Sequence, residues 1–426
     1  MGSSIDIKDH REHRPQTPQG IIKDIIENKR ILTHFQPIVS IKKNSIIGFE
    51  ALSRGYLKND DKIISPLELF TLAADNNLTV ELDRLCRELS IRKFIKDPFT
   101  NKDTLLFLNF ETSIIDSGVV GSGHLINMVN ELQIDPGHIV IEINESRVIN
   151  TDELIKFVKT YREYGFLIAV DDLGSGFSNL NRIPLLKPDI IKIHRTMIEN
   201  INKEYYIAEV YHSLLSLSRK IGALVIAEGV ENDEELMKVI ELGTDMIQGY
   251  YFLKPARLSN NAVKDCREKL TNASARFKNS ALNKINKKVY FDQRYKKVID
   301  SFLESVTKTN DEDLDCALED LVKLDLNIEC IYILDFSGIQ QSNTMLRNED
   351  AVLTKKSGLY KPALAGEDHS LKDYYLFIAS GAERFVTDPY ISMATGNICI
   401  TFAISYVNRN DKKYILCIDI KPDLLF

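Results

Sequence analysis

The chain has 426 residues, of which 44% are hydrophobic and 27% charged, a balance typical of globular proteins and a length that favours two domains. A formal net charge of −7 disfavours a nucleic-acid polymer as partner, although a small anionic ligand at a local metal site stays compatible with it. No apolar run reaches the ~18 residues of a membrane span, and the N-terminus shows no signal-peptide pattern. The six cysteines form no CxxC pair. We therefore expect a cytoplasmic protein with reduced thiols and no membrane association.

The first part of the chain predicts a barrel. Residues 1–20 are largely polar, with two prolines, and we expect them to be disordered. Residues 21–270 form the first predicted domain, in which amphipathic stretches of helical length separate most of the apolar runs. The eight runs, each a candidate strand, lie at 35–41, 46–52, 104–110, 138–143, 166–171, 189–193, 223–228 and 245–249.

Apolar strands that alternate with helices predict an α/β fold with a parallel sheet. Eight such strands in ~250 residues fit a closed (β/α)8 TIM barrel. Only four residues separate the first two runs, which is too short for a parallel crossover. We therefore expect a TIM-barrel variant with one antiparallel strand.

The second part of the chain predicts a smaller α+β domain. Residues 271–284 are small and polar and are expected to form a linker, followed by a domain at 285–426. A leading helix at 285–307 carries an apolar stripe, made of Phe291, Tyr295, Val298, Phe302 and Val306. A second helix is expected at about 311–324, and strands at 328–336, 383–392, 398–407 and 412–420.

Polar residues end almost every predicted strand of the barrel: Glu50, Asn109, Glu142, Asp171, Asp172, Lys192, Glu228 and Gln248. The carboxyl ends of barrel strands meet at one rim, where this many carboxylates would repel one another unless cations neutralise them. Oxygen ligands favour Mg²⁺ or Mn²⁺, and two such ions ~3.5–4 Å apart form a phosphodiester-cleaving site. A lone carboxylate at a strand end is usually a helix cap or a surface ion pair, but a series of this length favours a metal site.

Lys192 has three possible roles among these carboxylates: a donor that fixes their positions, a base after it loses its proton, or a group that stabilises developing charge. Gly174, Ser175 and Gly176 follow the adjacent aspartates. They are typical of an ordinary turn, or of a mobile loop that reports ligand or dimer state to the metals.

Seven ordered motifs resemble the EAL-domain family of cyclic di-GMP phosphodiesterases. They are FEALSR (49–54), which contains the naming motif Glu50-Ala51-Leu52, then FLNF (107–110), IEINES (141–146), DDLGSGFSNL (171–180), IKIHR (191–195), AEGVEN (227–232) and QGYYFLKP (248–255). The resemblance covers about residues 20–260. Asn144 stands where the family usually has Thr and Leu173 where it has Phe; both are neighbours of the expected ligands.

The resemblance implies opening of cyclic di-GMP to linear pGpG with two Mg²⁺ or Mn²⁺ ions per site. The first ion would be held by Glu50, Asn109, Glu142 and Asp171, and the second by Asp171, Asp172 and Glu228. Lys192 would be the catalytic lysine, acting with Glu50, Asp171, Asp172 and Glu228. Substrate contacts would come from Arg54, Leu52, Gln248 and Pro255, and support of the loop and rim from Glu145, Gly174, Ser175, Gly176 and Glu231. Ca²⁺ should inhibit, because it tolerates longer bonds and more ligands.

The C-terminal domain resembles a PAS-like or Cache-type sensory fold, which implies a small ligand of unknown identity; a packing module without ligand is the alternative. We expect a homodimer in which this domain regulates the barrel. The alternative to an active enzyme is a catalytically inactive cyclic di-GMP receptor that signals by binding.

Overall fold

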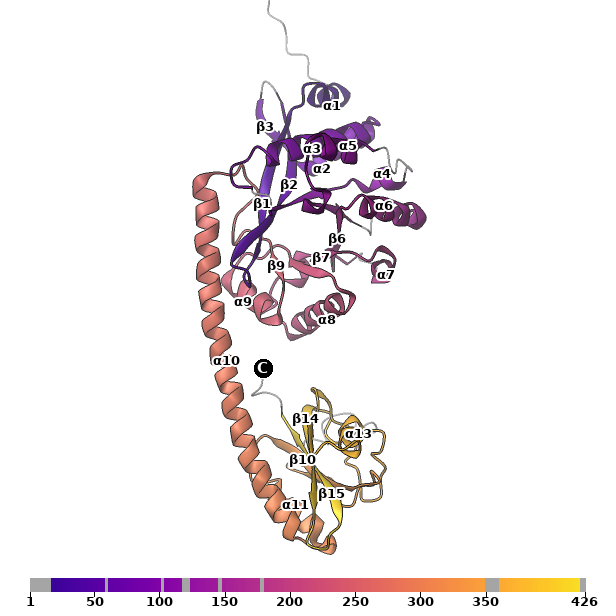
Figure 1. Cartoon of the computed structure of the whole chain (residues 1–426), viewed down its shortest axis with the longest axis vertical. Helices are drawn as coiled ribbons and strands as arrows, with labels where there is room; N and C mark the ends of the chain where they lie inside the picture. The colour runs from indigo at the N-terminus through magenta and orange to yellow at the C-terminus, as the bar shows by residue number, and fades with distance from the viewer. Residues whose placement is uncertain are drawn as a thin grey trace, which may run out of the picture. The chain divides into compact units, whose positions relative to one another are not determined.

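The computed structural model describes residues 17–57, 60–100, 103–116, 123–144, 148–176, 180–348 and 360–421. It divides into two compact units, Met1–Ala281 and Leu282–Phe426 (Figure 1). Each unit has its own hydrophobic core, so each is described separately.

The first unit contains a closed barrel. In its described part the strands are β1 (Ile31–Ser40), β2 (Ser45–Leu57), β3 (Asp60–Ile64), β4 (Leu105–Asn109), β5 (Ile139–Ile143), β6 (Leu167–Leu173), β7 (Ile190–Ile193), β8 (Leu224–Ala227) and β9 (Met246–Ile247). The order is β1-β9-β8-β7-β6-β5-β4-β2-β3, and pairing of β1 with β2 closes the ring. β1 is antiparallel to both neighbours, whereas the strands from β2 through β4 to β9 are parallel. The predicted TIM-barrel variant is confirmed.

Helices cover the outside of the barrel (Figure 1). They are α1 (Pro18–Glu27), α2 (Pro66–Asp75), α3 (Thr79–Phe94), α4 (Thr112–Asp116), α5 (His124–Glu131), α6 (Thr151–Glu163), α7 (Ile183–Leu186), α8 (Tyr205–Ile221), α9 (Asp233–Leu242) and the first part of α10 (Asn260–Lys308). The hairpin strand β3, which pairs with β2, was not predicted.

The barrel interior explains why polar residues end the strands. One apolar side chain from each of seven strands packs into a common cluster: Ile38, Phe107, Val140, Ala169, Ile190, Ile226 and Met246. Strand side chains alternate between two faces, so the residue two positions later points to the same interior, closer to the carboxyl end. On β4 to β7, and directly after β8 and β9, those residues are Asn109, Glu142, Asp171, Lys192, Glu228 and Gln248.

Two predicted segment boundaries are wrong. Residues 1–16 lie outside the described part, but helix α1 begins at Pro18, inside the segment predicted to be disordered, because the Thr17 side chain caps it by accepting a hydrogen bond from the Gly20 N–H. The predicted linker at 271–284 is part of the continuous helix α10. No Gly or Pro interrupts residues 260–308, so the polar composition does not break the helix.

The second unit is an α+β domain. Its described strands are β10 (Ile328–Asp335), β11 (Met345–Leu346), β12 (Arg384–Val386), β13 (Tyr390–Ile391), β14 (Ile398–Val407) and β15 (Lys413–Ile420), and its helices are the last part of α10, α11 (Leu314–Leu321) and α13 (Asp373–Ala379). The antiparallel sheet has the order β11-β10-β15-β14-β12, with β13 paired to β14. Pro389, which has no N–H to donate, lies between β12 and β13, so the strand predicted at 383–392 is two short strands.

The two faces of this sheet are covered differently. The apolar stripe of α10, including Tyr295, Phe302 and Val306, packs with α11 on one face. Tyr374 and Ile378 of α13 pack on the other face. The side chain of Phe291, also assigned to the stripe, lies outside the described part of the structure. The stripe is therefore buried on its own domain.

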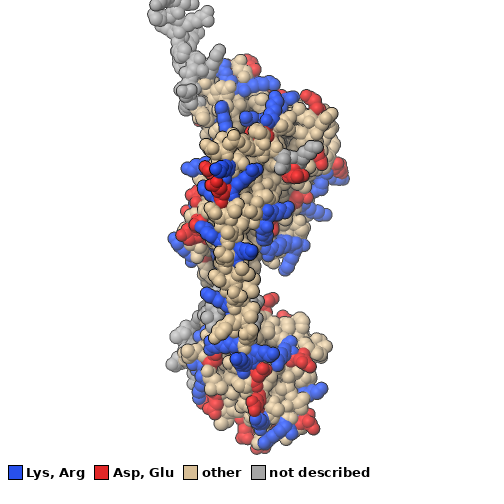
Figure 2. Space-filling view, turned by 60° about the vertical axis from the view of Figure 1, so that its left-hand side comes forward, with Lys and Arg blue, Asp and Glu red and all other residues tan. Residues whose placement is uncertain are grey.

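On one face of the molecule, both units carry side chains of both signs of charge (Figure 2). On the face seen in Figure 2, Lys and Arg side chains lie interspersed with Asp and Glu side chains. No helix in the described part of the chain combines the length and the apolar character that a membrane crossing requires.

Candidate active site

Lys192 is the centre of the polar cluster at the carboxyl end of the barrel. Its ammonium nitrogen lies 2.6 Å from Oε1 of Glu142, 2.8 Å from Oε1 of Glu228, 3.4 Å from Oδ1 of Asp171 and 3.5 Å from Oε2 of Glu50. The Lys192 side chain is only 1% exposed. One buried cation thus contacts four carboxylates, three on the strands β2, β5 and β6 and one directly after β8.

The protonation equilibria of the cluster reflect this excess of negative charge. Burial, reinforced by Glu50, raises the pKa of Glu142 well above its ordinary value. Burial likewise raises the pKa of Asp171, and it raises the pKa of Glu228 to about 8. Burial alone would lower the pKa of Lys192, but the surrounding carboxylates raise it well above its ordinary value. Lys192 therefore keeps its proton, while its neighbours lack enough positive charge to ionise together.

Glu50 is held in its ionised form by the charge of Lys192 and by hydrogen bonds. Asn109 Nδ2 donates to Oε1 over 2.8 Å, and Gln248 Nε2 donates to Oε2 over 2.6 Å. Burial would raise the pKa of Glu50, but Lys192 and these two amides together lower it. Gln248 also donates to Oε1 of Gln36 over 3.1 Å, and Gln36 in turn donates to the Leu253 carbonyl.

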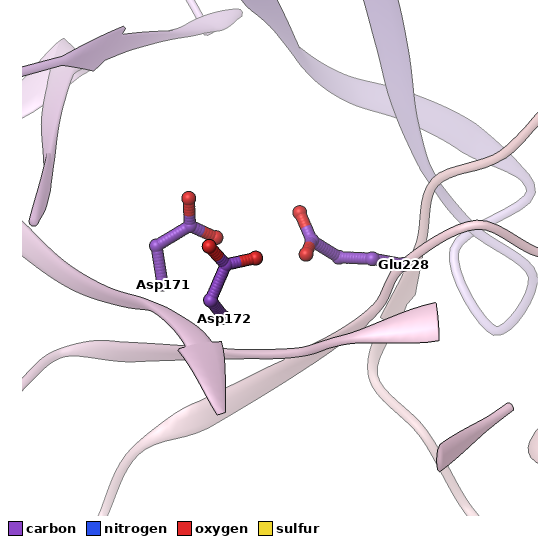
Figure 3. Close-up of side chains that lie close together, drawn as sticks. All are labelled: Asp171, Asp172 and Glu228. Carbon is purple, nitrogen blue, oxygen red and sulfur yellow. The ribbon is translucent and has the colours of Figure 1, made fainter. Parts of the chain in front are cut away.

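Asp171, Asp172 and Glu228 form a group with metal-ligand spacing. Each offers an oxygen, and these oxygens lie within 4.8 Å of one another. In Figure 3 the two aspartates project from the end of one strand and the Glu228 carboxylate faces them from the segment that follows β8. Adjacent residues of a regular strand point to opposite faces, but a register shift between Val170 and Leu173 and a left-handed backbone at Asp172 (φ +59°) bring both aspartates to one side.

The donor set fits divalent cations. Carboxylate oxygens are the ligands that Mg²⁺ and Mn²⁺ prefer, and the raised pKa values of Asp171 and Glu228 show that Lys192 alone does not balance their charge. The residues that would hold one ion are Asp171, Asp172 and Glu228. Asn144 supports this group, because its Nδ2 donates to Oδ2 of Asp172 over 2.6 Å.

A cavity of about 660 Å³ opens beside the cluster. Glu50, Asn109, Asp171 and Asp172 are among the residues that line it. The lining also includes Pro66, Leu67 and Phe70 at the start of α2 and Cys86 of α3. The cavity is therefore lined both by carboxylates of the rim and by apolar side chains of the neighbouring helices.

A buried ion pair lies at the edge of this cavity and was not predicted. Asp83 pairs with Arg87 on α3, and the Arg87 guanidinium lies 3.7 Å from the centre of the Phe110 ring. Asp83 accepts a hydrogen bond from the Glu111 N–H over 3.3 Å. This pair fixes the turn that follows Asn109.

Of the remaining predicted site residues, some lie at the cavity and others do not. Leu52 lines the cavity, whereas Arg54 and Pro255 are half-buried and are not among the described residues that line it. Glu145 lies outside the described residues. Glu231 pairs with Arg195 over 3.3 Å. Ser175 donates its N–H to the Asp172 carbonyl in a turn, and Gly174 and Gly176 have φ of +94° and +95°.

Sequence reasoning missed two further polar residues, although the alternation of strand side chains could have found both. His194 comes two positions after Lys192, and its Nε2 lies 3.9 Å from Oδ1 of Asp172. Gln36 lies two positions before Ile38, and because β1 runs in the reverse direction, this position also faces the carboxyl end of the barrel.

Comparison with known proteins gives consistent results. The sequence pattern described as EAL domain matches residues 19–255. The Bacillus subtilis protein YkuI, described as an uncharacterized EAL-domain containing protein, is 24% identical over 95% of this chain and 97% of its own length. The crystal structure of YkuI, in complex with substrate c-di-GMP and calcium, superposes with a TM-score of 0.74 at 25% identity, covering 94% of this chain and 98% of YkuI.

A further relative is the cyclic di-GMP phosphodiesterase PdeA of Borreliella burgdorferi, which is 30% identical over 56% of this chain. This chain spans nearly the whole of YkuI but only 35% of the length of PdeA. Since the family pattern matches more than half of the residues, and the barrel and its rim have the arrangement described above, the chain belongs to the EAL domain family.

Proposed function

We propose that this protein hydrolyses cyclic di-GMP to linear pGpG with the help of divalent cations. The observation that carries the proposal is the complete set of carboxylates around Lys192 beside the cavity. Relatives with this domain include a cyclic di-GMP phosphodiesterase, and YkuI binds c-di-GMP as its substrate. Water adds to one phosphorus, the bond from that phosphorus to the 3′ oxygen breaks, and the 3′ oxygen takes up a proton.

The charge of the rim supports the need for cations. A phosphodiester is anionic, and the Glu50, Asp171 and Asp172 carboxylates that line the cavity would repel it. Divalent cations, when bound, supply an activated water and polarise the phosphoryl oxygens. We place Asp171, Asp172 and Glu228 as ligands of one ion, and Glu50, Asn109, Glu142 and Asp171 as ligands of the other. Mg²⁺ and Mn²⁺ are the proposed metals.

Lys192 acts in this proposal as a charged donor rather than as a base. Its carboxylate neighbours raise its pKa well above the ordinary value, so a proton is costly to remove. The ammonium group keeps Glu142 and Glu228 oriented toward the rim through contacts of 2.6 and 2.8 Å. It also supplies a positive charge close to the reacting phosphate.

The direct test is incubation of the purified protein with cyclic di-GMP and Mg²⁺, with separation of the products by chromatography. The expected product is pGpG, formed only when the metal is present. The same rate in an excess of chelator would overturn the metal-dependent mechanism. An inactive receptor would bind cyclic di-GMP without forming product, but this alternative usually involves loss of a metal carboxylate or the lysine, and each of these residues is present.

For the C-terminal domain we propose a PAS-like sensory role with a small-molecule ligand. The sheet face under α13 supports this because it buries a polar group: Asp419 accepts hydrogen bonds from Thr401 over 2.7 Å and from Ser392 over 3.2 Å. Burial raises the pKa of Asp419. In this proposal the buried polar group below α13 is the contact for a polar ligand.

We also propose a homodimer in the cytoplasm. The apolar stripe of Tyr295, Phe302 and Val306 on α10 does not support a dimer, because these residues pack on their own domain. The support comes instead from Leu282, Ile285 and Val289, which recur at helical spacing on α10 and are about half exposed. An exposed apolar stripe of this kind favours pairing with a second helix.

A further inference from the structure

Three consecutive side chains directly after β7 contact the two chain segments that carry the Asp171, Asp172 and Glu228 group. His194, Arg195 and Thr196 belong to a short 3-10 turn that His194 caps. β7 lies between β6, which carries the two aspartates, and β8, which precedes Glu228. The 194–196 turn therefore lies where it can contact both the segment after β6 and the segment after β8.

Thr196 fixes the segment after β6. Its hydroxyl donates a hydrogen bond of 2.9 Å to the carbonyl of Gly174, two residues after Asp172. Gly174 has a φ of +94°, and a Cβ atom at this position would lie 2.5 Å from Cγ of Met197. The loop is thus held close against the turn, which only glycine permits.

Arg195 fixes the segment after β8. Its guanidinium donates a hydrogen bond to the carbonyl of Gly229, the residue that follows Glu228. A Cβ atom on Gly229, whose φ is +69°, would lie 2.8 Å from Cβ of Arg195. Glu231, 3.3 Å from the guanidinium, and Glu235, 3.9 Å from it, keep the arginine in place.

His194 approaches Asp172 itself. Its Nδ1 accepts the Thr196 N–H over 3.2 Å, so in the neutral ring the proton is assigned to Nε2. Nε2 lies 3.9 Å from Oδ1 of Asp172, too far for a direct hydrogen bond but within reach of one through water. Asn144 holds the other oxygen of Asp172, so donors approach this carboxylate from two sides.

We infer that the 194–196 turn is a positioning element that sets the spacing between the two aspartates of β6 and Glu228, and thereby the affinity of this group for a divalent cation. The inference rests on the proposed function only in that the group binds a metal. None of the three side chains is required to touch substrate. Groups that orient metal ligands typically change metal affinity or activity by ~10- to 100-fold when they are lost.

The test is Mn²⁺ binding to the full-length protein, measured by the electron paramagnetic resonance of free Mn²⁺, for Thr196→Val and Arg195→Met. Valine keeps the shape of Thr196 but cannot donate to the Gly174 carbonyl. Methionine keeps most of the aliphatic part of Arg195 but lacks its guanidinium group. Matched controls are Thr160→Val, which removes a hydroxyl that donates to a carbonyl within α6, and Arg276→Met, which removes a surface ion pair with Asp233.

We expect each turn variant to bind one of two Mn²⁺ ions ~10- to 100-fold more weakly, with the other ion and the melting temperature little changed, while the controls bind as the wild type does. Saturating Mn²⁺ should restore the hydrolysis rate. Wild-type affinity in both variants, equal weakening of both ions, or no Mn²⁺ binding by the wild type would overturn the inference. If the wild type binds two ions and the variants lose one, but no cyclic di-GMP is hydrolysed, the proposed function fails and the positioning role stands.

Discussion

Replacement of Lys192 by methionine should lower the stability of the metal-free protein and also the rate of hydrolysis, and only the stability should recover in part when Mg²⁺ is added. Methionine fills a similar volume but leaves Glu50, Glu142, Asp171 and Glu228 without the cation that they share. At an effective dielectric constant of about 20, a pair of unit charges 2.8 Å apart interacts by about 6 kcal/mol. The loss in unfolding free energy does not reach the sum of four such interactions, because the carboxylates take up protons when the lysine is absent.

The expected cost for the metal-free protein is therefore about 3–5 kcal/mol, the range found when one partner of a buried ion pair is removed. Urea unfolding of the barrel in chelator measures it, with Lys203→Met, a change at an exposed position, as the control. Mg²⁺ should recover part of the loss, since cations replace the missing charge, whereas kcat should stay about 10²- to 10³-fold below that of the wild type, the range for loss of one electrostatic donor. Equal unfolding free energies of K192M and wild type in chelator would refute this account of the cluster.

Three further predictions concern the metals and the assembly. Because burial raises the pKa of Glu228 to about 8, metal binding below that pH must release its proton. The apparent affinity for Mn²⁺ should therefore rise as the pH increases from 6 to about 8 and then level off; calorimetry at a series of pH values checks this, and an affinity that falls over the same interval would contradict it. Ca²⁺ should allow cyclic di-GMP to bind but should inhibit turnover, because its longer and more variable bonds disturb the spacing that two-metal hydrolysis needs; faster hydrolysis in Ca²⁺ than in Mg²⁺ would count against the ligand assignment. Ile285→Glu should weaken the proposed dimer by placing a charge on the exposed stripe of α10, which light scattering over a concentration series would show as a shift toward monomer, and an unchanged mass would remove this stripe as the interface.

The barrel could be predicted from the sequence because its strands are near-continuous apolar runs, and the reversed strand because four residues cannot carry a parallel crossover. Six polar residues of the rim followed from the same runs, since each lies two positions after an interior apolar residue: Asn109, Glu142, Asp171, Lys192, Glu228 and Gln248. The linker was predicted wrongly, because small polar residues in 271–284 are compatible with helix when no Gly or Pro intervenes.

Other features of the site depend on contacts between distant segments. The left-handed backbone of Asp172 and the register shift that turns both aspartates to one side have no signal in a single sequence. The same holds for the Asp83–Arg87 pair, since i,i+4 ion pairs on helices are common and mostly exposed. What makes this pair informative is its burial below the turn that follows Asn109.

The most direct test of the central claim is the fate of one oxygen atom. Cyclic di-GMP is incubated with the full-length protein and Mg²⁺ in water enriched in oxygen-18, and the products are analysed by mass spectrometry. Hydrolysis at the carboxylate rim predicts linear pGpG that carries one heavy oxygen in its terminal phosphate, with no such product from Glu50→Ala or in excess chelator. Recovery of intact, unlabelled cyclic di-GMP under conditions in which the protein binds both the nucleotide and Mg²⁺ would contradict the claim that this protein is a phosphodiesterase.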